Sequence, residues 1–143
     1  MTVRPTEAAD EIDAAHGLRR RVFLGEQKVD AKDEFDEYEA TSTQMVALDD
    51  GAVVATCRLR EYGEGGRDVK LERMAVERDL RGTGVGAALL AGAEDHCREL
   101  GARRVVVHAQ TQAQGFYGSN GYVPEGELFM EAGIEHIRMS KAL

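Results

Sequence analysis

Cysteine and proline are scarce in this chain, and each scarcity excludes certain classes of protein. Only Cys57 and Cys97 occur among the 143 residues, which is too few for a disulfide framework or a metal cage. Both are expected to be small, buried hydrophobic residues. Two prolines and a hydrophobic content of 43% are typical of a folded globular chain rather than a disordered one. The length fits a single domain over residues 1–143.

Long hydrophobic runs and an excess of positive charge are also missing. The longest apolar run, around Val85 to Ala93, is too short to cross a bilayer, and no charged-then-apolar segment opens the chain as a secretion signal would. The net charge of −8 argues against a nucleic-acid surface, which needs a basic patch. We therefore expect a cytoplasmic protein with neither a membrane nor a nucleic-acid partner.

The hydrophobic periodicity predicts both helices and strands. Helical spacing of apolar residues indicates helices over residues 6–24 and from about 82 to 100. Strands are expected at residues 2–4, 43–48, 53–60, 69–76 and 103–110, and twice more after Tyr122. The polar, acidic residues 25–41 are interpreted as a loop or a short helix, and residues 62–67 as a glycine-rich turn. Within residues 69–76, Leu71 and Ala75 are expected on one face, with a β-bulge explaining the interruption by Glu72 and Arg73.

The segment from Arg81 to Gly86 is the most informative part of the chain. Its glycines allow a ligand to approach the backbone closely, and it opens a helix whose first N–H groups lack partners. With the charge of Arg81 it predicts a cradle for a phosphate or pyrophosphate. A dinucleotide fingerprint from Gly82 to Ala87 would need a strand directly before it, but residues 77–79 intervene. A nucleoside-triphosphate loop would need Gly-Lys-Ser/Thr, which is absent.

As Arg-x-x-Gly-x-Gly, this segment resembles the GNAT superfamily of acetyl-CoA-dependent N-acetyltransferases, and four other segments extend the resemblance. They are Met74–Val76, Arg103–Gln110, Phe116–Tyr122 and the ElaA-like opening Arg21–Gln27. Gly133–Met139 is also similar to the ElaA-like branch, although Glu135 stands where proline is frequent. The resemblance implies an α/β fold with a mixed, mostly antiparallel sheet and helices on both faces. It also implies a splay between the fourth and fifth strands, where pantetheine inserts.

The same resemblance implies which residues bind coenzyme A. The strand before the glycines would pair with the pantetheine arm, the glycine segment would hold the pyrophosphate, and a tyrosine would lie beside the sulfur. These positions are Met74, Ala75, Val76, Arg81, Gly82, Thr83, Gly84, Val85, Gly86 and Tyr117. Substrate-binding positions are expected at Glu26, Gln27, His108 and His136. No metal is expected.

Acetyl transfer to an amine needs an acid for the departing thiolate and a base for the amine. Tyr117 is the expected acid, although a tyrosine there could simply pack its ring. Glu72 and Glu26 are the expected catalytic carboxylates, with an ion pair of Glu72 to Arg73 or Arg58 as the structural alternative. His108 and His136 are further candidates for the base, because histidine as a residue type has a suitable pKa, although a histidine on a buried strand is more often a core residue. A chain of waters could also serve as the base.

The acidic run of Glu34, Asp36, Glu37 and Glu39 is interpreted as a solvated face, with a lip that attracts a cationic amine as the alternative. The function expected is transfer of an acetyl group from acetyl-CoA to a primary amine by direct transfer in a ternary complex. The sequence leaves the acceptor open among small amines, amino sugars and peptides. It also leaves open whether the protein forms a homodimer. A non-catalytic acyl-CoA-binding or regulatory module is the alternative, followed by a dinucleotide-dependent oxidoreductase.

Overall fold

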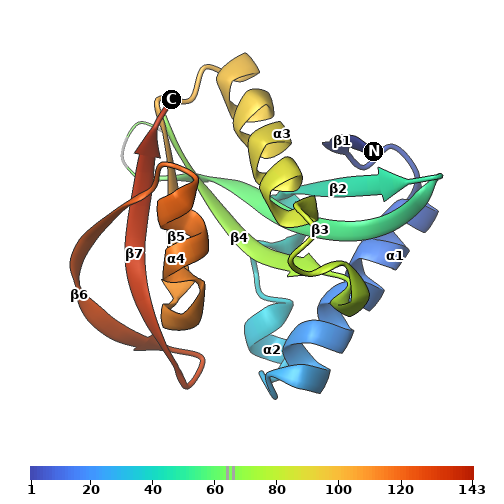
Figure 1. Cartoon of the computed structure of the whole chain (residues 1–143), viewed down its shortest axis with the longest axis horizontal. Coiled ribbons are helices and arrows are strands. Elements are labelled where there is room, and N and C mark those ends of the chain that lie inside the picture. Colours follow the sequence, from blue (N-terminus) through green and yellow to red (C-terminus); the bar gives the residue numbers. More distant parts are fainter. Residues whose placement is uncertain (64, 66) are drawn as a thin grey trace.

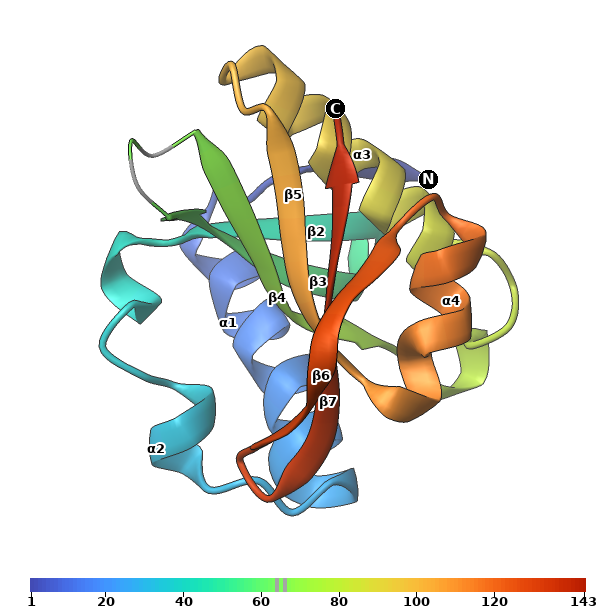
Figure 2. The same cartoon turned by 90° about the vertical axis from the view of Figure 1, so that its left-hand side faces the viewer.

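The structure is a computed structural model that describes residues 1–63, 65 and 67–143. In these residues seven strands form one mixed sheet, in the order β1-β2-β3-β4-β5-β7-β6 (Figures 1 and 2). The strands are β1 (Thr2–Pro5), β2 (Thr43–Asp49), β3 (Ala52–Tyr62), β4 (Asp68–Val76), β5 (Arg104–Gln110), β6 (Val123–Glu131) and β7 (Ile134–Ala142). Neighbours are antiparallel except for the parallel pair β4 and β5. The expected fold class is therefore confirmed.

The helices lie on both sides of this sheet. They are α1 (Ala9–Arg19), which continues as a π-helix (Arg20–Glu26), α2 (Ala31–Glu34), α3 (Val85–Glu99) and α4 (Gln114–Ser119). Short 3₁₀ turns occupy Glu39–Thr41, Arg78–Leu80 and Thr111–Ala113. The glycine-rich helix begins at Val85 rather than at residue 82, because Gly84 has the left-handed φ of +92°. The helix ends at Glu99, and Leu100, at the expected end of the helix, is its C-cap and is 66% exposed.

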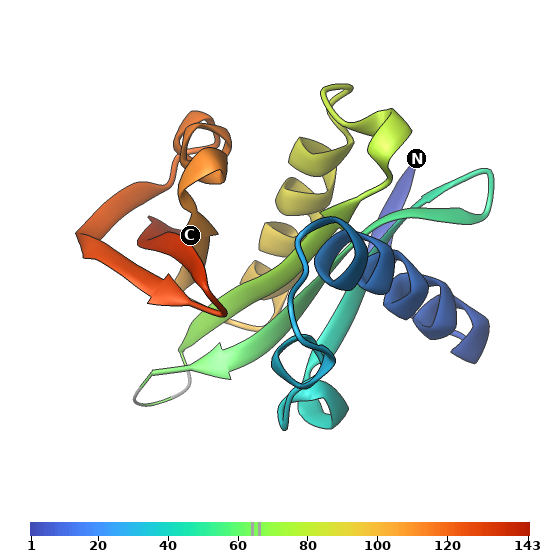
Figure 3. The same cartoon turned by 90° about the horizontal axis from the view of Figure 1, so that it is seen from below.

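The two faces of the sheet carry different side chains. Leu89 and Leu90 of α3 pack with Met45, Leu71 and Val107 on one face, which α3 and α4 cover (Figure 3). The opposite face lies under α1, its π-helical extension and α2. It holds two small apolar clusters around Leu18 and Ala15. Most of its remaining buried side chains are polar or charged: Arg19, Glu34, Gln44, Thr56, Arg58, Lys70, Glu72 and His136.

A β-bulge in β4 sets which residues reach each face. Arg73 has a φ of +57°, and the pairing with β3 shifts where Thr56 faces Ala75 but Arg58 faces Glu72. The extra residue reverses the alternation. Met74 therefore shares the main core with Leu71, whereas Ala75 packs against α1. The bulge is confirmed, and the expectation that Leu71 and Ala75 share a face was wrong for this reason.

Strands β4 and β5 separate halfway along their length. They pair only from Asp68 with Arg104 to Leu71 with Val107. Beyond Leu71, β4 has no partner on its β5 side, and its backbone groups there are available to a ligand. The expected splay is confirmed, and it opens a passage between the two faces of the sheet.

Other expectations about the chain are also decided. Cys57 and Cys97 are both fully buried and unpaired with each other, as expected for small hydrophobic residues. The turn expected over residues 62–67 includes positions 64 and 66, which lie outside the described residues. No helix in the described part of the chain is long and apolar enough to cross a membrane.

Candidate functional site

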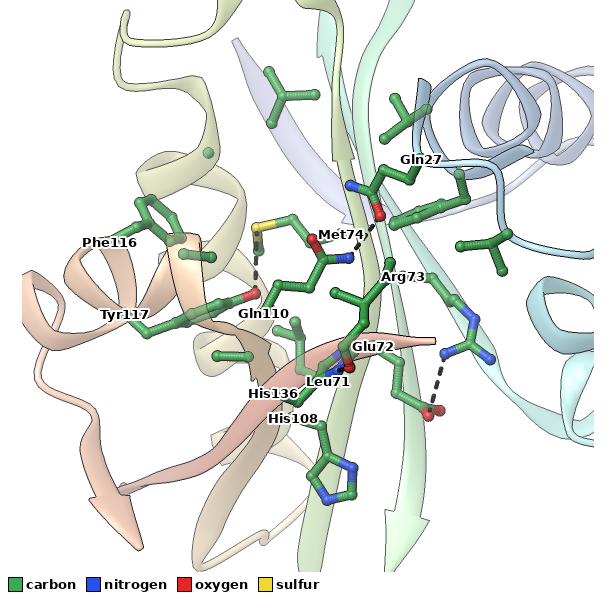
Figure 4. Close-up of a pocket in the computed structure, with 18 of the residues that line it drawn as sticks. Gln27, Leu71, Glu72, Arg73, Met74, His108, Gln110, Phe116, Tyr117 and His136 are labelled. Carbon is green, nitrogen blue, oxygen red and sulfur yellow. Dashed lines mark hydrogen bonds and ion pairs between the residues drawn. The ribbon is translucent and has the colours of Figure 1, made fainter. Parts of the chain in front are cut away.

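A cavity of about 980 Å³ passes through the gap between β4 and β5. On the α3 side its wall includes Gly82, Gly84 and Tyr117, and on the α1 side it includes Gln27 and Glu72. Figure 4 shows Tyr117 and Gln27 approaching the bulge of β4 from opposite sides. The cavity lies at the upper end of the range usual for small-molecule sites. One continuous space therefore reaches both faces of the sheet.

The glycine segment forms an open cradle at one end of this cavity. A Cβ added at Gly82 or Gly84 would meet no atom within 4 Å, and both residues have positive φ. Gly86 and Ala87 at the start of α3 line the cavity. The first N–H groups of a helix have no helical partners, and the helix dipole is positive there. Gly86 differs, because a Cβ there would lie 3.4 Å from the ring of Phe116. The first two glycines thus leave space for an anion, and the third allows α4 to pack closely.

Arg81 is already paired with a carboxylate across the mouth of the cavity. Its two terminal nitrogens donate to the two oxygens of Glu26 at 2.8 and 2.9 Å. The hydrogen bond from Arg81 lowers the pKa of the Glu26 carboxyl below its ordinary value. The expected phosphate-binding cation and an expected acceptor-binding residue therefore contact each other. Glu26 itself does not line the cavity.

The other expected cofactor positions divide by the direction of their side chains. Met74 and Val76 line the cavity. Ala75 packs on the opposite face, so only its backbone could contact a ligand in the splay. The Thr83 hydroxyl donates to the Leu80 carbonyl, and Val85 packs against the main core.

Tyr117 points its hydroxyl into the gap between the strands. The side chain is buried, and its one hydrogen bond within the described residues goes to the Met74 sulfur at 3.9 Å (Figure 4). A thioether is a weak acceptor. Burial raises the pKa of the phenol, so the group stays protonated near neutral pH. The hydroxyl is therefore a protonated donor with no strong competing partner.

Glu72 lies in a dense group of cations. Its carboxylate is 2.9 Å from Arg58, 2.8 Å from Arg60, 3.2 Å from Lys70 and 3.7 Å from Arg73. Burial alone would raise the pKa of this carboxyl, but the charges of Lys70 and Arg58 and the hydrogen bonds from Arg60 and Arg58 outweigh it and lower the pKa. The side chain lines the cavity but is a weak base in this setting.

The acidic run is not a solvated face. Glu34 is 2% exposed and accepts a hydrogen bond from Arg19 at 2.8 Å. Glu39 accepts from Arg19 and from Arg58, which also pairs with Asp36. The expectation of solvation was wrong for these three carboxylates because Arg19 and Arg58 are both fully buried and need them as partners. Only Glu37 among the four is exposed.

Two features of the cavity were not expected as site residues. Gln110 donates to Gln27 at 2.6 Å, so an amide bridge crosses the cavity (Figure 4). Glu131 lies 3.1 Å from the ring of His108 and 3.8 Å from that of His136. Gln110 could have been found from its position two residues after His108 on a strand, which puts both on one face. No local pattern identifies Glu131, since its role depends on how β5, β6 and β7 align.

Comparison with known proteins gives a consistent result. The model of the acetyltransferase (GNAT) domain matches residues 5–143. The N-acetyltransferase YjcF of Bacillus subtilis is 36% identical, with 92% of this chain and 93% of YjcF covered. An acyl-CoA N-acyltransferase structure from Pseudomonas aeruginosa has a TM-score of 0.85 at 27% identity, covering 99% and 100% of the two chains. Escherichia coli ElaA has a TM-score of 0.84 at 25% identity, with 98% of each chain covered.

Proposed function

Because the chain belongs to the GNAT acetyltransferase family, we propose that it transfers the acetyl group of acetyl-CoA directly to a primary amine. Membership makes the chain an acetyl-CoA-dependent N-acetyltransferase and confirms the resemblance carried by Arg81 to Gly86. The likeness to ElaA agrees with the expected branch. The primary amine as acceptor and the direct transfer are the proposal.

The observation that carries this proposal is the cavity that joins the two faces of the sheet through the splay. Direct transfer requires both substrates to meet at one point. The glycine cradle and Tyr117 lie at the α3 side of the gap, whereas Gln27 and the charged side chains lie at the α1 side. Donor and acceptor can therefore approach from opposite faces and meet between β4 and β5.

The residues present fit acetyl-CoA as donor. The open space at Gly82 and Gly84 and the unpaired N–H groups of α3 suit a pyrophosphate. The free edge of β4 beyond Leu71 suits the amides of a pantetheine arm. Bound there, acetyl-CoA would supply an activated acetyl thioester. Backbone N–H groups at the bulge would polarise its carbonyl, and Tyr117 would protonate the departing thiolate.

The two cysteines support direct transfer over an acetylated enzyme. Burial raises the pKa of the Cys57 thiol, and burial raises that of Cys97 to about 11. Neither is accessible to a thioester. A thiol that is buried and protonated is a poor nucleophile.

The test is release of free thiol from acetyl-CoA in the presence of a panel of small amines, amino sugars and peptides. We expect release with at least one amine, and initial-rate lines that intersect when both substrates are varied. Parallel lines would contradict direct transfer. Binding of coenzyme A without thiol release for any amine would instead identify a non-catalytic acyl-CoA-binding module.

A further inference from the structure

Three polar side chains of the cavity wall lie beside one another. They are His108 on β5, Glu131 at the end of β6 and His136 on β7. The Glu131 carboxylate lies between the two rings, with one oxygen 3.1 Å from His108 Nδ1 and the other 3.8 Å from His136 Nε2. The proposed function assigns this group no role.

The contacts determine which nitrogen of each ring carries a proton. A carboxylate can only accept, so His108 Nδ1 carries the hydrogen that faces Glu131. In the neutral ring, His108 Nε2 is then an unprotonated acceptor. His136 Nδ1 donates to the Ile134 carbonyl at 2.7 Å. His108 and Glu131 therefore form a dyad in which the carboxylate holds one tautomer of the imidazole and stabilises its charged form, as in serine hydrolases.

The surroundings keep this dyad in place. The ring of Phe129 meets His108 edge-on at 5.0 Å, and Tyr62 does so from β3 at 6.3 Å. The hydrogen bond from His108 is the largest influence on Glu131. With the positive charge of Lys70, it lowers the pKa of that carboxyl to about 2. Glu131 is thus fully ionised at neutral pH.

The carboxylates named as bases are bound to cations instead. Glu72 has four cationic neighbours and Glu26 pairs with Arg81, and each has a lowered pKa. A base must accept a proton near the operating pH. His108 has no competing cationic hydrogen-bond partner among the described residues, and its Nε2 is free to accept.

We propose that His108 is the general base for the acceptor amine and that Glu131 is the positioning residue that holds its tautomer. This inference rests on the proposed function, since it names a residue of the same reaction. It places the acceptor ammonium group on the charged face of the sheet, at the mouth of the splay.

The acceptor ammonium group loses two protons in the reaction. His108 Nε2 takes one proton from the ammonium group, directly or through one water. The freed nitrogen lone pair attacks the thioester carbonyl carbon, the C–N bond forms, and the C–S bond breaks with its electron pair leaving on sulfur. Tyr117 protonates the sulfur, and the second proton lost by nitrogen restores the Tyr117 hydroxyl through solvent. His108 returns its proton to solvent, so one proton is released per acetyl group transferred.

Charges from each neighbouring strand act on this dyad. Lys70 faces it from β4, Arg138 is the cross-strand neighbour of His108 on β7, and Arg60 lies over Tyr62 on β3. Glu72 on β4 balances part of this positive charge, because it pairs with Lys70 and Arg60. His136 contacts Glu131 from β7. The Glu131→Gln substitution removes the negative charge beside the imidazole and leaves these cations in place.

The experiment compares the pH dependence of kcat/KM in three variants with the wild type, using an amine that the wild type acetylates. His108→Gln should lower the neutral-pH rate by about 100-fold and remove the acid limb of the profile. Glu131→Gln should move that limb to lower pH and reduce the plateau by about tenfold. Glu127→Gln removes another β6 carboxylate, which is exposed and has no ion pair among the described residues, and should leave the profile unchanged.

A second readout does not depend on turnover. The imidazole signals of His108 in NMR should titrate at lower pH in Glu131→Gln than in the wild type, with no such change in Glu127→Gln. A wild-type profile in His108→Gln, or His108 signals that ignore Glu131, would overturn this inference while leaving the acetyltransferase function intact. A wild type that binds coenzyme A but acetylates no amine would overturn the function, and the base role with it.

Discussion

The two faces of the sheet have different roles in the proposed reaction. The face under α3 binds the acetyl donor mainly through backbone groups, and the face under α1 binds the acceptor through side chains. The α3 face is apolar and offers a ligand mostly backbone: the glycine cradle, the start of a helix and the free edge of β4. The α1 face presents buried arginines and carboxylates together with the buried His136. Backbone groups can bind any ligand that has the pyrophosphate and the amide groups of coenzyme A. A set of side chains, in contrast, can be specific for one acceptor. We therefore expect the specificity of the protein to depend on the acceptor side of the cavity rather than on the donor side.

This comparison also concerns stability. The apolar face is held by packing, while the segment that follows α1 is held by ion pairs that would be costly if broken. Arg19 is fully buried and donates to Glu34, Glu39 and Gln44. Removing one partner from such a network leaves charges buried without compensation. The charged face should consequently be as sensitive to substitution as the apolar core.

The largest expected effect comes from Arg19→Met. The free energy of unfolding should fall by about 3–5 kcal/mol, because Glu34 and Glu39 lose a buried partner. Arg21→Met is the matched control, since that side chain is 59% exposed and pairs only at the surface with Glu77; its effect should stay within about 1 kcal/mol. Urea unfolding of both variants measures the difference. Equal, small losses would show that the buried pairs do not hold this face.

Tyr117→Phe tests the proton donor at the boundary between the faces. The ring is kept and the hydroxyl removed, so turnover should fall by about 100-fold while coenzyme A affinity changes little. Tyr122→Phe is the control, because it removes a hydroxyl that donates to Glu94 away from the cavity. That variant should lose stability but keep its turnover. Wild-type kcat in a folded Tyr117→Phe protein would remove Tyr117 from the mechanism.

Gly84→Asp tests whether the apolar face binds through its backbone. A carboxylate placed in the open cradle should raise the Kd for coenzyme A by at least about tenfold, or 1.4 kcal/mol. Gly101→Asp adds the same charge at a positive φ at the other end of α3, also with open space around the Cβ. Gly101→Asp should cause a similar backbone strain but leave the affinity for coenzyme A unchanged. Calorimetry decides, and unchanged binding in Gly84→Asp would mean that the pyrophosphate lies elsewhere.

Glu26→Gln should have the smallest effect on coenzyme A binding. It tests whether Glu26 belongs to the acceptor side of the cavity. The pair with Arg81 is partly exposed, so its loss should change coenzyme A affinity by less than about threefold. If Glu26 contacts the acceptor, the KM for the amine should rise or kcat should fall. If it only ties the π-helix to the glycine segment, the melting temperature should fall with normal kinetics. Measuring both on one variant separates the two roles.

The sequence predicted the strands and the glycine-rich helix well, because their signals are local. Alternation, helical spacing and glycines act within a few residues, and the segment from Arg81 to Gly86 was recognised without its partners. The errors of the sequence-based prediction also concern single elements. The first helix begins at Ala9, after the expected residue 6, and continues as a π-helix to Glu26. The bulge at Arg73 changed which face Ala75 occupies, which alternation alone does not reveal.

The sequence by itself determined the family, the glycine cradle and the position of Tyr117, because each is a pattern of neighbouring residues that backbone geometry requires. Only the tertiary structure decided what the charged residues do. Glu34 and Arg19 are 15 residues apart, and His108 and Glu131 are 23 apart. Whether a carboxylate is solvated, neutralised by an arginine or held against a histidine depends on which side chains the fold places within about 4 Å. Spacing along the chain does not encode that distance.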